Sequence, residues 1–385
     1  MRNVTWINDL KLRGGWGQTG NQSGLGNNSY LMAYSIKRIQ WFGEGNDANA
    51  IPIRSASQLR YPDLKWETTT QTDIGIDITL FRNRLTIYAD YYYKRTKDML
   101  MWIELPPGQL ATTIPNNGGT IINKGFEFTV NSKNIVGKDF KWNTDFNISF
   151  NRNKFESLKL TPVYYAARTT DYVGESVVRN TAGYPLGTFW GYISDGVNPE
   201  TGELMYRDIN GDGIVSSSDR TVIGDPNPDF TFGLTNTFSY KGINLSFLIQ
   251  GSVGNDIYNV GRMESEGMYD GKNQTTRVLG RWRVPGQITD IPKAGFEMHN
   301  STYFLEDGSY VRLKDLSLLR CACRGTQEAA YNEVAALYLG YQPAHFDQVQ
   351  GHGSRGKPER QQWYSAGTRL GNLSSLQVNI ARSEG

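Results

Sequence analysis

The sequence contains only two cysteines and three histidines among its 385 residues. Two cysteines cannot build a disulfide framework or a four-thiolate zinc site. The 40 basic and 38 acidic side chains leave a formal charge of +2, without the basic surplus that a general nucleic-acid-binding protein needs. No stretch approaches 18 consecutive apolar residues, so the sequence predicts no membrane-spanning helix. The start also lacks the basic and apolar regions of a signal peptide, which taken alone suggests a cytosolic protein.

Aromatic side chains and glycine are abundant where these other features are scarce. Aromatics make up 12% of the chain, a content too high for a disordered protein, and there are 42 glycines. The apolar fraction is only 38%, below the roughly 45–50% of an ordinary soluble domain. This combination is what strands with one apolar face and one polar face would give.

The clearest pattern is a strict alternation of apolar and polar residues, which predicts an all-β chain. In 73–80 the apolar residues occupy every second position, and after a short turn at 82–84 the pattern resumes over 85–93. Side chains on a strand point alternately to opposite faces, so two such runs across a short polar turn indicate a β-hairpin. Similar runs follow at 126–131, 140–151, 230–240 and 243–249.

Two architectures fit long amphipathic strands joined in hairpins. A soluble sandwich buries the apolar faces against a second sheet, whereas a transmembrane barrel turns them to lipid and uses strands of about 9–11 residues. Three features favour the barrel: polar faces that stay polar along whole strands, Tyr and Trp gathered at strand ends, and turns that are short on one side and long on the other. The short turns are 82–84 and 241–242, and the long loops are predicted at roughly 101–119, 156–229 and 251–309.

Several segments resemble the C-terminal barrel region of SusC/RagA-type TonB-dependent outer-membrane transporters of Bacteroidetes, in the order and spacing of that family. They are LKLRGGWGQTGNQ (10–22), LKWETTTQTDIGIDITLFRNRLTIYADYYYKRTKDML (64–100), NNGGTIINKGFEFTVNSKNI (116–135), GYPLGTFWGY (183–192), and the longer matches at 206–259 and 301–318. The resemblance is nearly continuous over 1–319. It implies an all-β fold, a partial transmembrane antiparallel β-barrel that forms the second half of a 22-stranded barrel, with the plug domain absent.

The resemblance also implies a function and a set of partners. Intact members import oligosaccharides or peptides across the outer membrane, are energised through TonB, and carry a SusD-type surface lipoprotein as a lid; they are not enzymes. We therefore expect an outer-membrane location, contact with lipid and no nucleic-acid partner. Because half a barrel leaves two unpaired edges, which lipid cannot satisfy, we expect this polypeptide alone to be an incomplete, non-functional fragment. Two rival readings are a secreted or surface β-rich glycan-binding module and a surface glycosidase.

The character of the sequence changes at residue 320, so we divide the chain into a barrel region, 1–319, and a tail, 320–385. The alternation stops there, and both cysteines and two of the histidines lie in the tail: Cys321, Cys323, His345 and His352. Their spacing matches no standard zinc pattern. Suitable codons read in a shifted frame would encode segments that resemble the closing strands of the family. We interpret the tail as the product of a frameshift near 317–321, with irregular structure, a hypothesis that the nucleotide sequence tests.

One loop fits the template of a calcium-binding loop. Its oxygen-bearing positions are Asp208, Asn210, Asp212, Ile214 (through its carbonyl), Ser216 and Asp219. Gly213 stands at the sixth position, where the template requires a sharp turn, but the last acid is Asp rather than the usual Glu. The alternative is an Asx- and Gly-rich turn without metal. Apart from calcium here, we expect no cofactor.

Aromatic side chains in the predicted long loops are the candidates for substrate contact, because they could stack on sugar rings. They are Tyr164, Tyr165, Phe189, Trp190 and Tyr192. The alternative is that they pack against the lid or the plug. Acid pairs such as Glu200/Glu203 and Glu306/Asp307 do not establish the carboxylate separation of a glycosidase, and His299 has no evident nucleophile partner. We predict no catalytic residues.

Overall fold

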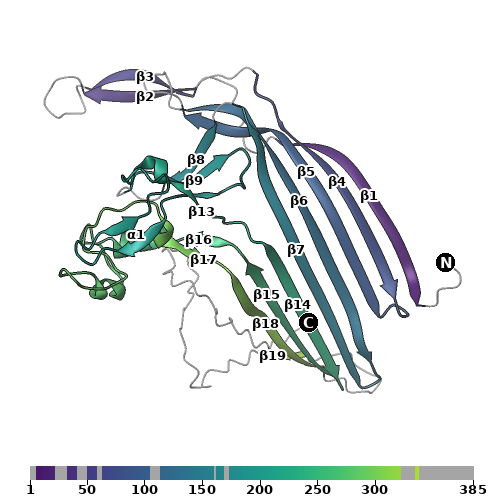
Figure 1. Ribbon diagram of the computed structural model, residues 1–385. Helices are drawn as coiled ribbons and strands as arrows, with labels where there is room; N and C mark the ends of the chain where they lie inside the picture. Colours follow the sequence, from purple (N-terminus) through teal and green to yellow (C-terminus); the bar gives the residue numbers. More distant parts are fainter. Residues whose placement is uncertain are drawn as a thin grey trace.

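The computed structural model describes residues 6–21, 33–40, 50–58, 63–104, 113–159, 162–168, 173–321 and 334–337. A nine-stranded antiparallel sheet dominates it, in the order β1-β4-β5-β6-β7-β14-β15-β18-β19 (Figure 1). The strands are β1 (Ile7–Asn21), β4 (Glu67–Leu80), β5 (Leu85–Glu104), β6 (Thr113–Val136), β7 (Phe140–Leu158), β14 (Phe230–Tyr240), β15 (Ile243–Val253), β18 (Tyr310–Cys321) and β19 (Val334–Leu337). We call this sheet the wall.

The register of the wall aligns the alternating patterns of separate strands into continuous rows. One row is apolar from β1 to β18: Leu10, Ile78, Ile87, Val130, Phe146, Leu234, Ile249 and Leu313. The adjacent row, one residue along each strand, is polar or glycine apart from one tyrosine: Lys11, Asp77, Tyr88, Thr129, Asn147, Gly233, Gln250 and Arg312. Since neighbours along a strand point to opposite faces, the wall has one apolar and one polar face.

The apolar face forms a band with defined limits. Its upper limit is a row with Tyr91, Phe126 and Phe150, and the next row on the same face contains Lys124 and Arg152. Near the turns the band ends at residues such as Tyr240, which closes the 11-residue strand β14. At about 3.4 Å per residue and a strand tilt of about 40°, this strand spans about 26 Å, close to the roughly 25 Å apolar band of a transmembrane barrel.

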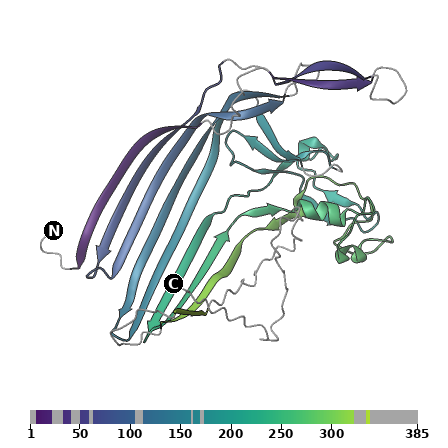
Figure 2. The ribbon, with the colours of Figure 1, turned by 180° about the vertical axis from the view of Figure 1, so that it is seen from behind.

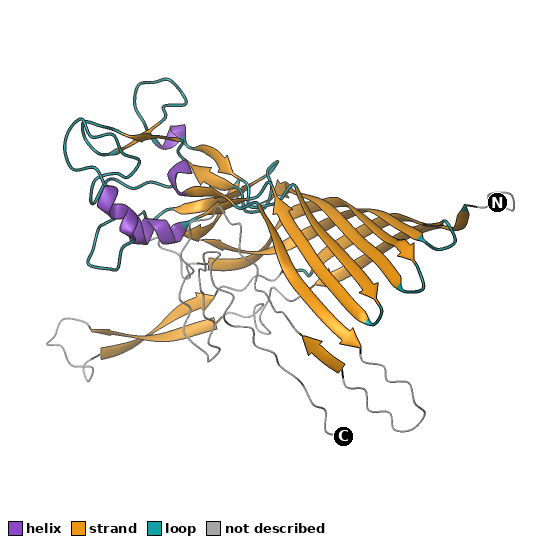
Figure 3. Cartoon of the chain, turned by 90° about the horizontal axis from the view of Figure 1, so that it is seen from below, coloured by secondary structure: helices purple, strands orange, loops and turns teal. Residues whose placement is uncertain are grey.

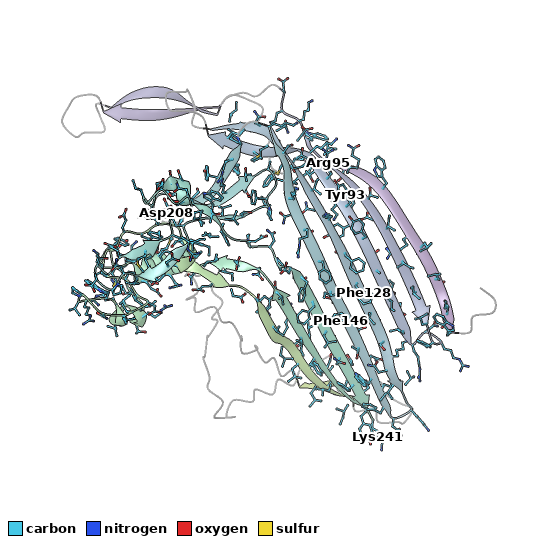
Figure 4. The ribbon with its side chains drawn as sticks, in the orientation of Figure 1. Tyr93, Arg95, Phe128, Phe146, Asp208 and Lys241 are labelled. Atoms are coloured by element: carbon cyan, nitrogen blue, oxygen red, sulfur yellow. The ribbon has the colours of Figure 1, made fainter. Side chains whose placement is uncertain are left out.

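Three strands are much longer than the roughly 9–11 residues that a transmembrane barrel predicts, so the predicted length was wrong for these three. β5, β6 and β7 have 20, 24 and 19 residues. The predicted loop at 101–119 is likewise wrong at both ends, because β5 continues to Glu104 and β6 begins at Thr113; residues 105–112 lie outside the described ranges. Above the band apolar and polar residues no longer alternate, and Met101, Asn116 and Ile121 are all buried there, so pairing continues without a period-two pattern to reveal it. An ion pair between Arg95 and Glu156, 2.6 Å apart, lies in this extension (Figure 4).

The short turns lie where the sequence predicts them. β4 and β5 end and begin at the paired residues Leu80 and Leu85, and β14 and β15 are joined by Lys241 and Gly242 alone. These two have φ angles of 46° and 83°, the left-handed pair that a two-residue type I′ turn requires. Both turns lie at the same end of the wall (Figure 1).

The chain between β7 and β14, and between β15 and β18, folds into a unit that we call the loop subdomain (162–168, 173–229 and 254–309). Its main sheet contains β8 (Val163–Arg168), β9 (Ser176–Thr181), β10 (Phe189–Gly191) and β13 (Thr221–Gly224). It also has two small two-stranded sheets: β11 (Ser194–Val197) with β12 (Leu204–Tyr206), and β16 (Asp256–Tyr258) with β17 (Leu305–Asp307). The remaining elements are helix α1 (Val260–Glu266) and the 3₁₀ turns η2 (Ser217–Asp219), η3 (Thr276–Gly280) and η4 (Thr302–Phe304). Its buried core is Leu204, Met263, Phe296, Met298 and Phe304. The two segments were predicted as long loops, and strands of three to six residues are too short for an alternating pattern.

The loop subdomain is docked on the wall at the end opposite the short turns (Figures 1 and 2). Phe155 of β7 has no exposed surface, and its backbone exchanges hydrogen bonds with Tyr184 (N to O, 3.0 Å) and Gly183 (O to N, 2.8 Å). Asn153 lies two residues before Phe155, on the same polar face of β7, and its side-chain amide donates to the Asn227 side-chain oxygen at 2.6 Å. The subdomain therefore rests on the polar face of the wall.

The wall is an open sheet. Within the described residues, no strand pairs with the outer edge of β1, and β19 covers only the end of β18 (Figure 3). A separate hairpin of β2 (Ala33–Gln40) and β3 (Ala50–Gln58) projects from the opposite end to the turns (Figure 1). In the described part of the chain, no helix is long and apolar enough to cross a membrane.

Of the tail, the structure describes the last residues of β18 and residues 334–337. These four residues form β19, which pairs with β18 from Leu318 to Cys321. This short segment is therefore a strand and not irregular. Cys323, His345 and His352 lie outside the described residues. The frameshift stays a hypothesis.

Candidate ligand-binding site

The polar face of the wall carries an ion cluster that crosses three strands. Arg13 of β1 contacts Asp77 of β4 at 2.7 Å and Asp90 of β5 at 2.7 Å. It reaches β5 by passing over Gly75, where a Cβ would overlap the Asp90 carboxylate and lie 2.9 Å from the Arg13 guanidinium carbon. The glycine therefore allows one cation to join two carboxylates on a water-exposed face.

Two of the five candidate aromatics pack inside the loop subdomain. Phe189 and Tyr192 are each 8% exposed. The Phe189 ring lies 5.7 Å from that of Tyr258, and the Tyr192 ring lies 5.3 Å from those of both Tyr206 and His299. Their partners belong to the subdomain itself. The packing of Phe189 and Tyr192 within the subdomain is the arrangement that the structure shows, and contact with a substrate stays a prediction for them.

Two other candidates lie on one face of the subdomain sheet, on either side of an arginine. Tyr165 of β8 is the cross-strand partner of Arg179 of β9. On the other side, the Arg179 guanidinium stacks on the Trp190 ring of β10, with 3.8 Å between the guanidinium carbon and the ring centroid. Tyr164 pairs with Asn180 and so points to the opposite face. The sheet thus places Tyr165, Arg179 and Trp190 side by side.

A cavity of about 210 Å³ opens beside this arginine. Its walls come from β9, β10, β13 and the connection between β9 and β10: Arg179, Thr181, Ala182, Tyr184, Thr188, Trp190 and Val222. Tyr184 is also the residue whose carbonyl accepts from Phe155 of the wall, so the cavity lies where the subdomain meets the polar face. It combines aromatic and apolar walls with one cation, as small-ligand sites commonly do.

The predicted calcium loop forms a compact turn, with Asp208 at the subdomain end of the molecule (Figure 4). The Asp208 carboxylate accepts from the amides of Gly211 and Gly213, each at 2.7 Å. Asp219, with no exposed surface, accepts from Ile209 (2.9 Å), Asn210 (3.2 Å) and Ser216 (2.7 Å). The structure thus gathers the predicted residues, while Ile214 is 69% exposed.

These backbone contacts perturb the buried acid. The hydrogen bond from the Ser216 amide, helped by those from Asn210 and Ile209, lowers the pKa of the Asp219 carboxyl below its ordinary value, although burial opposes this shift. In the described part of the chain, no group of three or more His, Cys, Asp or Glu side chains is placed to hold a metal ion. Amide and carbonyl oxygens complete a calcium site, so calcium binding stays a prediction, which a calorimetric titration with millimolar calcium tests.

The acids and the histidine considered for hydrolysis have structural partners. Glu203 forms an ion pair with Lys293 at 2.6 Å, and Glu306 contacts the buried Arg262 at 3.4 Å. His299 lies between Tyr192 and Tyr206, and burial raises the pKa of the Tyr206 hydroxyl, which accepts from the His299 amide at 3.2 Å. These side chains serve packing and pairing within the subdomain.

Comparison with known proteins identifies the family of this wall. The model of the family described as "TonB dependent receptor-like, beta-barrel" matches residues 3–250. The chain belongs to this TonB-dependent receptor family. This match confirms the barrel fold, and the family is one of transporters, not enzymes. With the matches to SusC and RagAB below, it also confirms the resemblance to SusC/RagA-type proteins.

Relatives of this TonB-dependent receptor chain agree with this assignment. TonB-dependent receptors P3 and P26 of Formosa agariphila are 32% and 34% identical to it over 341 residues, which cover 82% and 83% of this chain. TonB-dependent receptor SusC of Bacteroides thetaiotaomicron is 29% identical over 341 residues and 83% of this chain. The match spans about a third of each relative's length, 33%, 33% and 32% respectively.

Solved structures give the same fold. The structure of the RagAB peptide transporter superposes with a TM-score of 0.73 at 25% identity, covering 87% of this chain and 36% of that one. The RagAB peptide importer in its closed-closed state gives a TM-score of 0.71, also at 25% identity and with the same coverage.

Of the cavity residues the sequence analysis named only Trp190, and Arg179 is the charged residue that it missed. It stands eleven positions before Trp190, within a segment predicted as loop. The residues next to it in the sequence do not distinguish it from the other 39 of the 40 basic residues. The pairing of β8 with β9 and of β9 with β10 brings it between two of the aromatics that were found.

Proposed function

We propose that this protein contributes the barrel wall and loop subdomain of an outer-membrane TonB-dependent transporter that imports a nutrient. Its substrate is an oligosaccharide or a peptide. The observation that carries this proposal is the register of the wall, which collects apolar residues of every strand from β1 to β18 into one band of about bilayer thickness. The partners are a SusD-like surface lipoprotein that covers the barrel and the TonB complex that supplies energy.

The two faces of the wall have different roles. The apolar face meets outer-membrane lipid, and the polar face, with Arg13 and its two aspartates, lines the water-filled interior. The loop subdomain, docked on the polar face through Phe155 and Asn153, stands above that interior and contacts the substrate. Such a division needs no catalytic group, because the protein binds and releases the nutrient unchanged.

Membrane fractionation and uptake test this function. We expect the full transporter to which this chain contributes in the outer-membrane fraction, with a gel mobility that changes on heating. We expect deletion of the gene for that transporter or for TonB to stop uptake of one nutrient class while growth on simple sugars continues. Recovery in the soluble fraction would instead favour a glycan-binding module. Unchanged uptake of every nutrient after the deletion would refute import.

A further inference from the structure

Arg179 has a guanidinium group without an acidic partner in the described part of the chain. No carboxylate there lies within ion-pair distance of it, whereas two other arginines of the loop subdomain are paired: Arg220 with Glu175 at 2.8 Å, and Arg207 with Asp195. The Arg179 Nε is buried and donates to no atom of the described residues. A buried donor without an acceptor costs free energy, and such groups call for an explanation.

The stacking on Trp190 leaves the binding edge of this guanidinium available. A guanidinium places its N–H groups in its own plane, so a ring against its face does not occupy them. In that plane the fork geometry matches the two oxygens of a carboxylate. Trp190 thus fixes the orientation of the cation without neutralising it.

The surroundings of Arg179 offer flat apolar surfaces and little room. Tyr165 and Tyr184 are 53% and 44% exposed. The cavity of about 210 Å³ is smaller than the roughly 300–1,000 Å³ of sites that enclose a whole drug-sized ligand, and holds about seven waters at about 30 Å³ each. It therefore suits one unit of a chain whose remainder extends along the exposed tyrosines.

We propose that this cavity is a subsite for the carboxylate of a uronic acid residue in an oligosaccharide. The carboxylate occupies the Arg179 fork, and the exposed tyrosine rings accept the apolar C–H faces of the sugars. The hydroxyls of Thr181 and Thr188 donate to the carbonyls of Pro162 and Pro185, each at 2.8 Å, so their oxygens are left to accept from sugar hydroxyls. The inference rests on the proposed import function and specifies its substrate class. An acidic peptide would also bring a carboxylate, but two exposed rings beside a shallow cavity favour flat, rigid sugar units.

Binding to the intact protein, purified from outer membranes in detergent, tests the subsite apart from transport. The probes are trigalacturonic acid, its uncharged methyl ester, maltotriose and triglutamate, measured by calorimetry and by Trp fluorescence. We expect trigalacturonic acid to bind at least about tenfold more tightly than the methyl ester and maltotriose, because both lack the carboxylate and lose a hydrogen-bonded charge pair. Triglutamate keeps a carboxylate but has no sugar faces to pack on the tyrosine rings, so we expect it to bind more weakly than trigalacturonic acid as well. Arg179→Gln should remove this preference, and Arg179→Lys should retain part of it.

Arg207→Gln is the matched control, because it removes the same charge from the same subdomain and does not line the cavity. It should bind trigalacturonic acid like the unchanged protein. The subsite is overturned if the methyl ester binds as tightly as the acid, if Arg179→Gln with an unaltered heat-dependent mobility keeps the preference, or if triglutamate binds most tightly. Because these measurements need neither TonB nor uptake, such a result leaves the import function standing, and loss of uptake would not affect the subsite.

Discussion

Asp219 stabilises the 208–219 turn from its interior, where a single carboxylate accepts three backbone amides. An aspartate at this position was found from sequence, because the calcium-loop template fixes the spacing of its acids. Arg179 was not, because its importance comes from neighbours on other strands: Tyr165 and Trp190. At the scale of residues, local motifs can be read along the chain, while sites made by pairing between strands cannot.

Replacement of Asp219 by Asn should loosen this turn. The lowered pKa means that the folded turn favours the ionised carboxylate, so its stabilisation is complete above the ordinary carboxyl pKa of about 4 and is lost as the pH falls through the depressed value. We expect faster hydrogen exchange at the amides of Ile209, Asn210 and Ser216, measured by mass spectrometry at neutral pH. The control is Asp212→Asn, an exposed residue that accepts only from Ile214 in its backbone contacts. Equal exchange in both variants would contradict this role.

At the scale of elements, the alternating pattern predicted the strands of the wall within the apolar band but did not predict their extensions beyond it. β14 and β15 match their predicted runs closely, since nearly all of each lies within the band. The upper parts of β5 and β6 were predicted as loop, because apolar and polar residues do not alternate there: Met101 and Asn116, for example, are both buried. Pairing in that region is held by backbone hydrogen bonds and by ion pairs such as Lys159 with Asp98 at 2.9 Å, which leave no periodic signature.

The band predicts a depth-dependent cost for charge on β14. Leu234→Arg, near the middle of the band, should destabilise the protein by about 2–4 kcal/mol in lipid vesicles, whereas Phe230→Arg, at its edge, should cost about 0–1 kcal/mol beyond the loss of the ring. Thr235→Arg is the matched control, because it points to the polar face next to Asp145 and should change stability little. Urea titration of the vesicle-inserted protein measures all three. A cost for Thr235→Arg equal to that for Leu234→Arg would show that the faces are assigned wrongly.

At the scale of the whole molecule, the loop subdomain and the wall behave as one body because the subdomain is fixed to β7. The alternating pattern says nothing about this contact, since it lies where a folded insertion meets a strand far above the band. Phe155 carries it: the ring has no exposed surface, and the backbone on both sides bonds to the connection between β9 and β10. Family resemblance gave the class of fold, but the position of the subdomain on the polar face required the structure.

Phe155→Ala should detach the subdomain from the wall. Loss of a fully buried phenyl ring costs about 3–5 kcal/mol, so the junction keeps only its polar contacts, such as the hydrogen bond between Asn153 and Asn227. We expect limited proteolysis to cut the 159–229 segment much faster, while the wall strands stay protected. Phe150→Ala, on the same strand but on the apolar face and 37% exposed, is the control and should leave the cleavage rate unchanged. Equal protection in the two variants would contradict the junction.

The docked subdomain also bears on the order in which the chain assembles. Hairpins β4–β5 and β14–β15 close over a few residues, whereas β7 can pair with β14 only after the chain 159–229 has returned. Closing so long a loop costs on the order of 3 kcal/mol more conformational entropy than closing a two-residue turn. Arg152 at the top of β7 pairs with Asp229 at 2.6 Å, one residue before β14 begins. If the subdomain folds before the wall closes, it brings β14 next to β7 and shortens this search. The same insertion that carries the cavity would then also set the order in which the strands of the wall pair.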